Sequence, residues 1–434
     1  MDMINSVKDL VSFFLHRIGE QNLHEDIGDK KMALRKSAIE KILEKDLNKD
    51  AYSYFGNDDL QIDLKLIEEK EGVDKIIKTI KLKIPHLFNN PGFCATIIDG
   101  EFCESLSCLP KNVKIIPFKD FGEKEFAYSL KKEKAWDNPV ALINIALANS
   151  GFLLEAKKSS SQEKIIINHI NSSSVSTVEH IRNIYRLGEG AKLTIVENFY
   201  NLHEPQTRVN NTVSEWILEE GAVVNLYSLD YWVCKAGSKN ITNSFVHQKK
   251  NSVLSLFNCY TNVNSVKNNM HVWLEDEYAN CNLYSISLLN KSSCVEDNIL
   301  IEHLKKNCQS QQVYKSVISD SAKGCFDSLV LVHKDAQKTS AIQQNNNILL
   351  SENAVAQSNP QLEIFADDVV CAHGSTVGQI DSEALFYLRS RGIGQRAAYN
   401  ILLKAFLHEV LDKINDPLAL KITEDAINQK LKNL

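Results

Sequence analysis

Hydrophobic and polar residues follow a helical period at the start of the chain. Apolar residues there recur at the three- and four-residue spacing of an amphipathic helix. They are Val7, Leu10, Val11, Phe14 and Leu15. A second helix is predicted over 31–47, and the region ends at Pro85 and a turn-rich segment, 89–92. We therefore expect an N-terminal helical domain over residues 1–85.

The next segment mixes both periods. Short runs rich in β-branched residues lie between 94 and 118, and Asp99-Gly100 is a dipeptide typical of a hairpin turn. A helix is predicted over 138–148, followed by Gly151, which is typical of a helix end. Residues 86–150 are thus predicted to be a mixed α/β connecting region.

From 151 to 378 apolar and polar residues mostly alternate, which is the period of half-buried strands. Turns of small or polar residues precede these strands at Gly190, Gly221, Asn251 and Tyr278, at spacings of 31, 30 and 27 residues. A regular period of this size is typical of a solenoid, because one unit cannot bury its own apolar face and must stack on the next. The pattern predicts a mainly β protein with a parallel β-helix over 151–378. A jelly-roll sandwich is the second choice.

Helical spacing returns after residue 378. Asp381 is predicted to cap a helix over 382–389, and Asp416 with Pro417 opens the last helix. Between them a long amphipathic helix is predicted over 395–413. Its inward residues are expected to be Ile401, Leu402, Ala405, Phe406 and Val410. Residues 379–434 are thus predicted to form a C-terminal helical domain.

Composition and charge exclude several classes of function. The net charge is −6, and no cluster of Lys and Arg interleaved with aromatic residues occurs, which argues against nucleic-acid binding. No stretch approaches the roughly 20 apolar residues of a membrane span. The N-terminal sequence does not resemble a secretion signal, so we expect a cytoplasmic protein. The ten cysteines form no Cys-X-X-Cys pair and are expected to be free thiols.

Most familiar catalytic motifs are missing from the sequence. It contains neither a phosphate-binding loop nor the Gly-X-Ser-X-Gly nucleophile motif. Gly392, Gly394 and Ala397 match a dinucleotide-binding pattern, but a predicted helix precedes them where the motif requires a strand. Asp367 and Asp368 are adjacent, and successive strand residues point to opposite faces, so they make a poor catalytic pair.

Cys371 and His373 are the most distinctive local pair. If the strand continues through them, they share one face, and a thiol beside an imidazole suits a soft or borderline metal. The same spacing also fits a buried cysteine next to a hydrogen-bonded histidine, and the residues alone leave both readings open. Gly374 and Gly378 indicate a close backbone approach, either at a turn or against a partner.

The stretch QLEIFADDVVCAHGSTVGQIDSEALFYLRSRGI resembles the C-terminal signature of the SufB/SufD family of iron–sulfur cluster assembly proteins. The segments FDSLVLVHKDAQKTSAIQQNNNILLSENAVAQSNPQLEI, IRNIYRLGEGAKLTIVEN and ATIIDGEFCESLSCLP are similar to that family as well. Gly374 stands where SufB-type chains typically carry a glutamate, so the chain looks like the SufD branch.

The resemblance implies a right-handed parallel β-helix flanked by helical domains, acting as a scaffold subunit and not as an enzyme. It implies a heterodimer with a SufB-like paralogue, and a homodimer is plausible for the isolated chain. At the subunit interface His373, with Cys371 nearby, would face a cysteine of the partner, and both are possible metal ligands. A transient iron–sulfur cluster would form there, with no cofactor held stably by this chain.

The resemblance also implies a SufC-like ABC-type ATPase, which would carry the ATP and dock on the C-terminal helices. The expected docking residues are Leu385, Phe386, Tyr387, Arg389, Arg391 and Gly392. Two alternatives to the scaffold function are a β-helix enzyme acting on carbohydrates and a purely structural homo-oligomer.

Overall fold

The computed structural model describes residues 38, 73–84, 92–122, 138–204, 207–229 and 237–432. The helices predicted before residue 50 therefore lie outside the described residues, except for the helical Ala38. The first complete described helix is α4 (Val73–Lys83), whose Ile76 and Ile80 are buried against Ile98.

A hairpin opens the β structure, as predicted. Strand β1 (Cys94–Ile98) turns at Asp99 and Gly100, with φ of 48° and 80°, into β2 (Glu101–Phe102). A two-residue hairpin turn with positive φ at both positions is favoured by Asp-Gly, because glycine has no Cβ to clash. The elements that follow are η3 (Glu104–Leu106), β3 (Val113–Pro117), η4 (Phe118–Asp120) and α6 (Pro139–Leu147).

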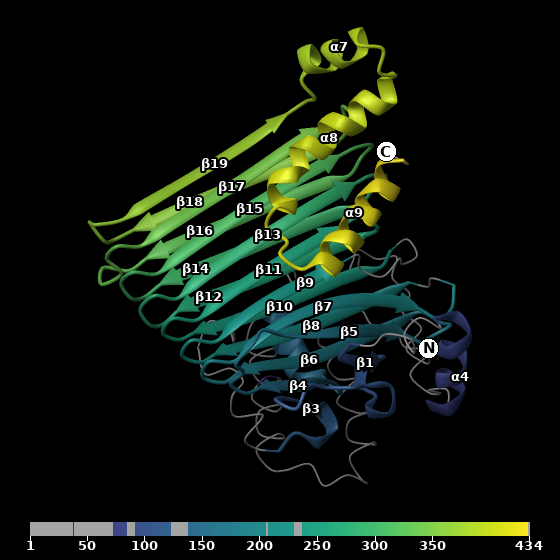
Figure 1. Ribbon diagram of the computed structural model, residues 1–434, viewed down its shortest axis with the longest axis vertical. Helices are drawn as coiled ribbons and strands as arrows, with labels where there is room; N and C mark the ends of the chain where they lie inside the picture. The colour runs from purple at the N-terminus through teal and green to yellow at the C-terminus, as the bar shows by residue number, and fades with distance from the viewer. Residues whose placement is uncertain are drawn as a thin grey trace.

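The remaining strands form a parallel β-solenoid (Figure 1). In chain order they are β4 (Ser150–Ala156), β5 (Glu163–Asn171), β6 (Thr177–Leu187), β7 (Lys192–Asn201), β8 (Arg208–Leu218), β9 (Val223–Leu229), β10 (Lys239–Gln248), β11 (Val253–Tyr260), β12 (Ser265–Leu274), β13 (Asn280–Leu289), β14 (Cys294–His303), β15 (Gln309–Ile318), β16 (Lys323–Val332), β17 (Ser340–Leu349), β18 (Val355–Ile364) and β19 (Val370–Gly378).

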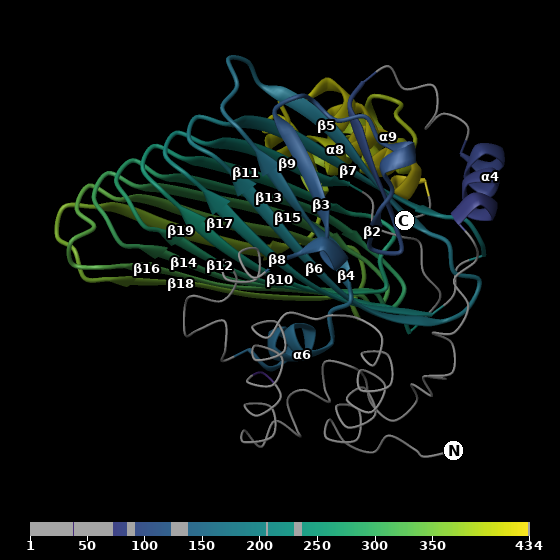
Figure 2. The same cartoon turned by 90° about the horizontal axis from the view of Figure 1, so that it is seen from below.

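Each strand pairs in parallel with the strand two places further along the chain, so the solenoid has two stacks. We call β4, β6 and onward to β18 the even stack, and β5, β7 and onward to β19 the odd stack. Figure 2 shows the two stacks facing each other. Strand β1 pairs with β5 and so extends the odd stack into the segment expected only to connect domains.

Turn residues in the left-handed region set the length of a coil. Positive φ occurs at Gly190, Gly221, Asn251 and Tyr278, the four positions of the predicted repeat. Paired residues lie 26 to 32 positions apart, from Lys239 with Ser265 to Lys323 with Val355. The predicted β-helix is therefore confirmed, and the jelly-roll alternative is wrong because the pairings within both stacks are parallel.

One inward-facing row of the odd stack runs along the whole solenoid and shows how the interior changes. By register it contains Ile165, Ile195, Leu226, Leu256, Leu283, Gln312, Gln343 and His373. The first five are aliphatic, and all members before His373 are buried. This row is thus apolar over most of the solenoid and becomes polar near the last coil, whereas the next inward row already carries the buried polar residues Glu197, Ser228 and Asn258.

The C-terminal helices are α7 (Ser382–Ser390), α8 (Gln395–Leu411) and α9 (Pro417–Leu431). Asp381 caps α7 and Asp416 caps α9 through hydrogen bonds to backbone N–H groups, as predicted. The dinucleotide pattern lies in the turn between α7 and α8, where Gly392 has φ of 84°. A helix therefore precedes it, and the sequence-based rejection of a nucleotide site is consistent with the fold.

Helices α8 and α9 lie on the outer face of the odd stack, whereas α6 lies on that of the even stack (Figure 2). The predicted inward face of α8 is partly right. Val410 is buried and the half-buried Phe406 packs against the same core, but Ile401 is 45% exposed. The other buried contacts come from Leu403 and Leu407. Apolar residues occur on two sides of this helix, and the sheet beneath it selects the side that is buried.

Candidate functional site

The C-terminal end of the solenoid is open. Strand β18 pairs with β16 and β19 pairs with β17, and among the described strands none pairs with the outer edge of either. An unpaired parallel edge presents a row of backbone N–H and C=O groups that can bind another strand. The last coil therefore leaves an edge at which a further strand could pair.

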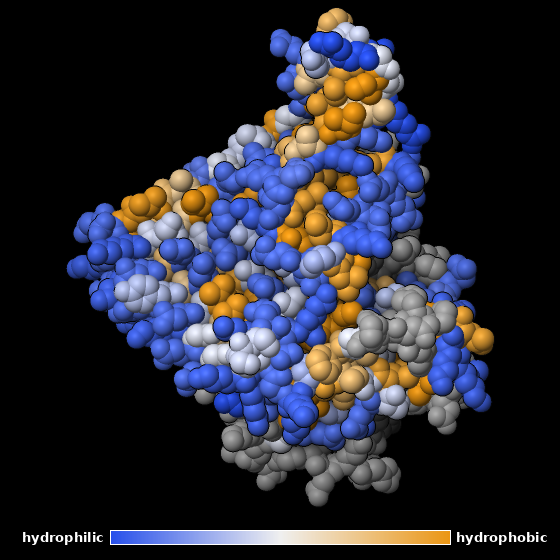
Figure 3. Space-filling model, viewed as in Figure 1, coloured by the Kyte–Doolittle hydropathy of each residue, from blue (hydrophilic) through white to orange (hydrophobic). Residues whose placement is uncertain are grey.

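Apolar side chains surround this edge. Phe365 is 64% exposed and Val370 is 71% exposed, on either side of the bend that joins β18 to β19. Figure 3 shows apolar surface in this area and a separate apolar area over α7 and α8. Large exposed apolar side chains next to each other are typical of an interaction surface.

Cys371 and His373 lie on the inward face of β19. Their register partners on β17 are Ala341 and Gln343, both fully buried. On an internal coil these two positions would be core positions, whereas here Cys371 is half-buried and His373 is exposed. The structure thus places a thiol and an imidazole at the open end of the solenoid interior. We call this open end, with Cys371 and His373, the mouth.

The electrostatics of the pair favour a neutral thiol. Partial burial raises the pKa of Cys371, and a hydrogen bond from the Ala341 backbone N–H lowers it in part. A thiol in this state becomes a ligand when a metal ion displaces its proton. In the part of the chain that the structure describes, no three His, Cys, Asp or Glu side chains are grouped so as to hold a metal ion. Cys371 and His373 therefore supply an incomplete ligand set.

The sequence analysis did not predict a network of polar side chains that lies in the solenoid interior next to the mouth. Ser328 Oγ donates to Gln312 Oε1 at 2.8 Å and accepts from Gln343 Nε2 at 2.9 Å. Nearer the mouth, Ser358 Oγ lies 2.7 Å from both Asn345 Nδ2 and Ser375 Oγ. The available signal was the run of amides from 343 to 347, in which alternate residues had to face the interior.

Two sequence-based interpretations near the mouth are corrected. Asp367 and Asp368 lie in the bend between β18 and β19, so strand alternation does not separate their side chains. A Cβ added at Gly374 or Gly378 would meet no described atom within 4 Å, so a close approach at a turn among the described residues is excluded, whereas a close approach to a partner stays a prediction. Both glycines lie at outward positions of the terminal strand.

The predicted docking residues lie on and after α7. Phe386 and Tyr387 are 74% and 57% exposed, Leu385 is half-buried, and Arg389 is exposed. The guanidinium of Arg391 stacks over the Tyr387 ring at 5.3 Å. Helix α7 has no buried residue and projects beyond the last coil (Figure 1). This short helix is therefore a second exposed apolar surface, separate from the mouth.

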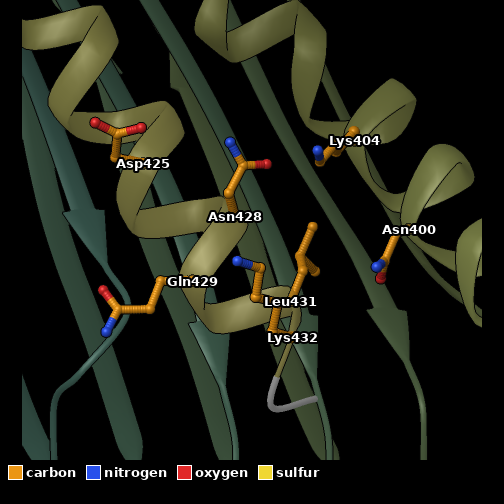
Figure 4. A pocket seen from close by; sticks show the side chains of 7 residues that line it. All are labelled: Asn400, Lys404, Asp425, Asn428, Gln429, Leu431 and Lys432. Atoms are coloured by element: carbon orange, nitrogen blue, oxygen red, sulfur yellow. The ribbon is translucent and has the colours of Figure 1, made fainter.

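A polar hollow lies between α8 and α9 (Figure 4). Its lining residues are Asn400, Lys404, Asp425, Asn428, Gln429, Leu431 and Lys432. These described lining residues include two lysines and one carboxylate but neither histidine nor cysteine, so they offer neither an imidazole nor a thiolate to a metal ion. The mouth, and not this hollow, is therefore the candidate functional site.

Fold and mouth together define a β-solenoid protein whose coil ends in an open edge carrying possible metal ligands. A family model described as the SufBD core domain of the SUF system for FeS cluster assembly matches residues 165–406. The chain belongs to this family, and the match includes Cys371, His373 and α7.

Individual relatives support the SufD branch. The chain is 31% identical over 244 residues to the iron–sulfur cluster assembly protein SufD of Escherichia coli (strain K12), covering 55% of each chain. It is 30% identical over 238 residues to a SufBD family protein of Synechocystis sp., covering 53% of this chain and 51% of the relative. It is also 26% identical over 251 residues to SufD of Plasmodium berghei, covering 57% and 18%. The chain thus spans about half the length, or less, of these relatives.

None of the described helices is both long enough and apolar enough to cross a lipid bilayer.

Proposed function

We propose that the chain is a non-catalytic scaffold subunit for iron–sulfur cluster assembly, paired through its open mouth with a SufB-like paralogue. The observation that carries the proposal is the unpaired edge of β18 and β19 around the inward-facing His373. A partner solenoid would cover the edge and the exposed apolar residues beside it. It would also add the ligands that Cys371 and His373 lack.

In this arrangement a nascent cluster is cargo held at the subunit boundary, and no cofactor stays with this chain. Thiolate and imidazole are the ligand types that iron–sulfur centres use in proteins. Ligands divided between two subunits can separate when the subunits move, which suits a cluster that must be released. The role of the chain is then to position one imidazole and to shape the mouth.

A SufC-like ABC-type ATPase would bind and hydrolyse ATP and dock on α7. The exposed ring of Phe386 beside the stacked Tyr387–Arg391 pair supports this assignment, because aromatic residues and arginine supply much of the binding energy at protein interfaces. We also infer a compartment that keeps thiols reduced, such as the cytoplasm, since all cysteines that the structure describes are free.

The deciding experiment compares His373→Ala, His373→Cys and the wild type in cluster assembly with SufB-like and SufC-like proteins. We expect His373→Ala to lose most assembly while the three proteins still co-purify. His373→Cys should retain part of it, because a thiolate is also an iron ligand. His408→Ala, an exposed histidine on α8, is the matched control and should assemble clusters at the wild-type rate. Wild-type assembly by His373→Ala would refute the proposed role.

The same preparation distinguishes the scaffold from a structural homo-oligomer. The exposed edge of β19 can also pair with a second copy of itself, so a homodimer is expected when the chain is alone. Added SufB-like partner should convert this homodimer into a heterodimer on a sizing column. A homodimer that persists beside excess partner would count against the proposal.

A further inference from the structure

Three cysteines lie within one short segment, far along the chain from the mouth. Cys94 begins β1, Cys103 follows β2, and Cys108 lies beyond η3. All three are free thiols. Their exposure differs sharply, because Cys94 is 9% exposed, Cys103 is half-buried and Cys108 is exposed. None of them takes part in the proposed scaffold function.

Cys94 and Cys108 face each other directly. They form an isolated antiparallel bridge in which each backbone N–H donates to the other residue's carbonyl oxygen at 2.8 Å. In such a mutually hydrogen-bonded pair the Cα atoms are about 5.5 Å apart and both side chains lie on the same face. Disulfides require Cα atoms about 4.4–6.8 Å apart, so the backbone already meets this requirement.

Cys103 is close in sequence but poorly placed. Its N–H donates to the Thr96 carbonyl, so it stands opposite Thr96 and diagonally from Cys94. Diagonal neighbours on paired strands are roughly 7–8 Å apart, which is too far for a disulfide without backbone movement. Its Sγ instead lies 3.4 Å from Ser105 Oγ. Cys94 and Cys108 are therefore the only two of these three thiols that stand directly opposite each other.

We propose that Cys94 and Cys108 form a reversible disulfide, a thiol–disulfide site that fastens the η3 segment onto β1. Directly opposed Cβ atoms in a hydrogen-bonded pair lie near 5.5 Å, whereas a relaxed disulfide places them about 3.5–4.5 Å apart. The bond therefore pulls the strands together and is under strain. Strained and exposed disulfides are the readily reduced kind, so the site is a switch and not a permanent link.

The difference in exposure sets the order of reaction with a low-molecular-weight disulfide such as oxidised glutathione. The exposed Cys108 thiolate attacks one glutathione sulfur, forms a mixed disulfide and releases one glutathione thiolate. Cys94 Sγ, as thiolate, then attacks Cys108 Sγ and releases the second. Two protein thiols are oxidised, one glutathione disulfide is reduced to two thiols, and the two protons leave on those thiols. Burial raises the pKa of Cys94, and a hydrogen bond from the Cys108 backbone N–H partly offsets this, so Cys94 is the less reactive thiol until the mixed disulfide forms directly opposite it.

The test uses the full chain, equilibrated in buffers of graded reduced and oxidised glutathione, acid-quenched and alkylated. Trypsin leaves all three cysteines on one peptide, whereas cleavage after Glu101 and Glu104 places each on its own. We expect non-reducing mass spectrometry to show the Cys94–Cys108 link in the wild type and in Cys103→Ser. The link should disappear on mild reduction. In Cys94→Ser, a glutathione adduct should accumulate on Cys108 at least about tenfold above the wild type, because the resolving thiol is gone.

Cys108→Ser separates an ordered reaction from general thiol oxidation. In that variant the buried Cys94 should stay reduced at the same ratio of reduced to oxidised glutathione. A link from Cys103 to either neighbour in the folded protein would overturn the proposal, as would a Cys94–Cys108 link that forms only in urea. Folding of each variant is checked by circular dichroism. In the reduced wild type, the rates at which the three thiols are alkylated should follow their exposure, with Cys108 fastest and Cys94 slowest.

Discussion

The two ends of this solenoid have the same backbone architecture but differ in whether the end of the interior is covered. At the N-terminal end, β1 covers the odd stack, and Ile165 and Ile195 are fully buried in the interior. At the C-terminal end the same inward row continues through Gln312 and Gln343 to the exposed His373. The closed end stabilises the fold by burying aliphatic side chains, whereas the open end gives up that stabilisation and keeps a polar, accessible mouth.

The largest expected effect tests this contrast directly. Ile195→Ala should lower the free energy of unfolding by about 2–5 kcal/mol, because it leaves a cavity in a filled interior. His373→Ala, in the same row, should change it by less than about 0.5 kcal/mol, since its side chain is already exposed. Urea unfolding of both variants measures the difference. Similar losses for the two would mean that the open end is as important to folding as the closed one.

A second pair of variants separates the two apolar surfaces of the open end. Val370→Asp places a charge on the apolar edge of β19 and should weaken pairing with the proposed SufB-like partner by about tenfold or more. Phe386→Ala should weaken docking of the proposed SufC-like ATPase by a similar factor. Binding is measured for each partner alone.

Each of these two variants is the control for the other. Val370→Asp should leave ATPase binding unchanged, and Phe386→Ala should leave pairing unchanged. Loss of both interactions in either variant would show that α7 and the edge of β19 act as one surface.

Asp297 is a buried carboxyl on β14 that lies among other polar side chains of the solenoid interior. Burial raises the pKa of its carboxyl to about 6, and a hydrogen bond from Asn268 opposes the shift. A raised folded-state pKa means that the folded protein binds the proton more tightly, so stability falls as pH rises from about 4 to 6 and is then flat. At pH 8 Asp297→Asn should therefore be more stable than the wild type by about 1–3 kcal/mol.

Urea midpoints at pH 4, 6 and 8 check this prediction. The advantage of Asp297→Asn should disappear at pH 4, where the wild-type carboxyl is neutral in the folded state. The exposed Asp335→Asn is the control and should give no such pH-dependent gain. A gain that is constant with pH would indicate better packing of the amide and not the removal of a buried charge.

Most of the correct predictions from the sequence concern features that depend only on residues close together in the chain. Strand alternation placed Cys371 and His373 on one face, and the turn residues Gly190 and Gly221 gave the coil length, because both depend only on neighbouring residues. The polar interior and the buried side of α8 depend on which surfaces meet. Ile401 and Leu403 are equally apolar, and only contact with the odd stack decides that Leu403 is buried. Residue spacing alone could not predict the unpaired edge, since it is defined by an absent neighbour, and only the family resemblance led us to expect an interface there.

The smallest expected effect concerns how the C-terminal helices are held at the two ends. Asp416 caps α9 and also pairs with Lys164 at 2.8 Å, whereas Asp381 caps the projecting α7 and is exposed. Asp416→Ala should cost about 1–2 kcal/mol of unfolding free energy, because it removes a cap and a partly buried ion pair together. Asp381→Ala should instead speed hydrogen exchange within α7 and leave global unfolding nearly unchanged, because no residue of α7 is buried. An equal global loss from the two substitutions would show that α7 is folded as firmly as α9, and that the open end is more rigid than its exposure indicates.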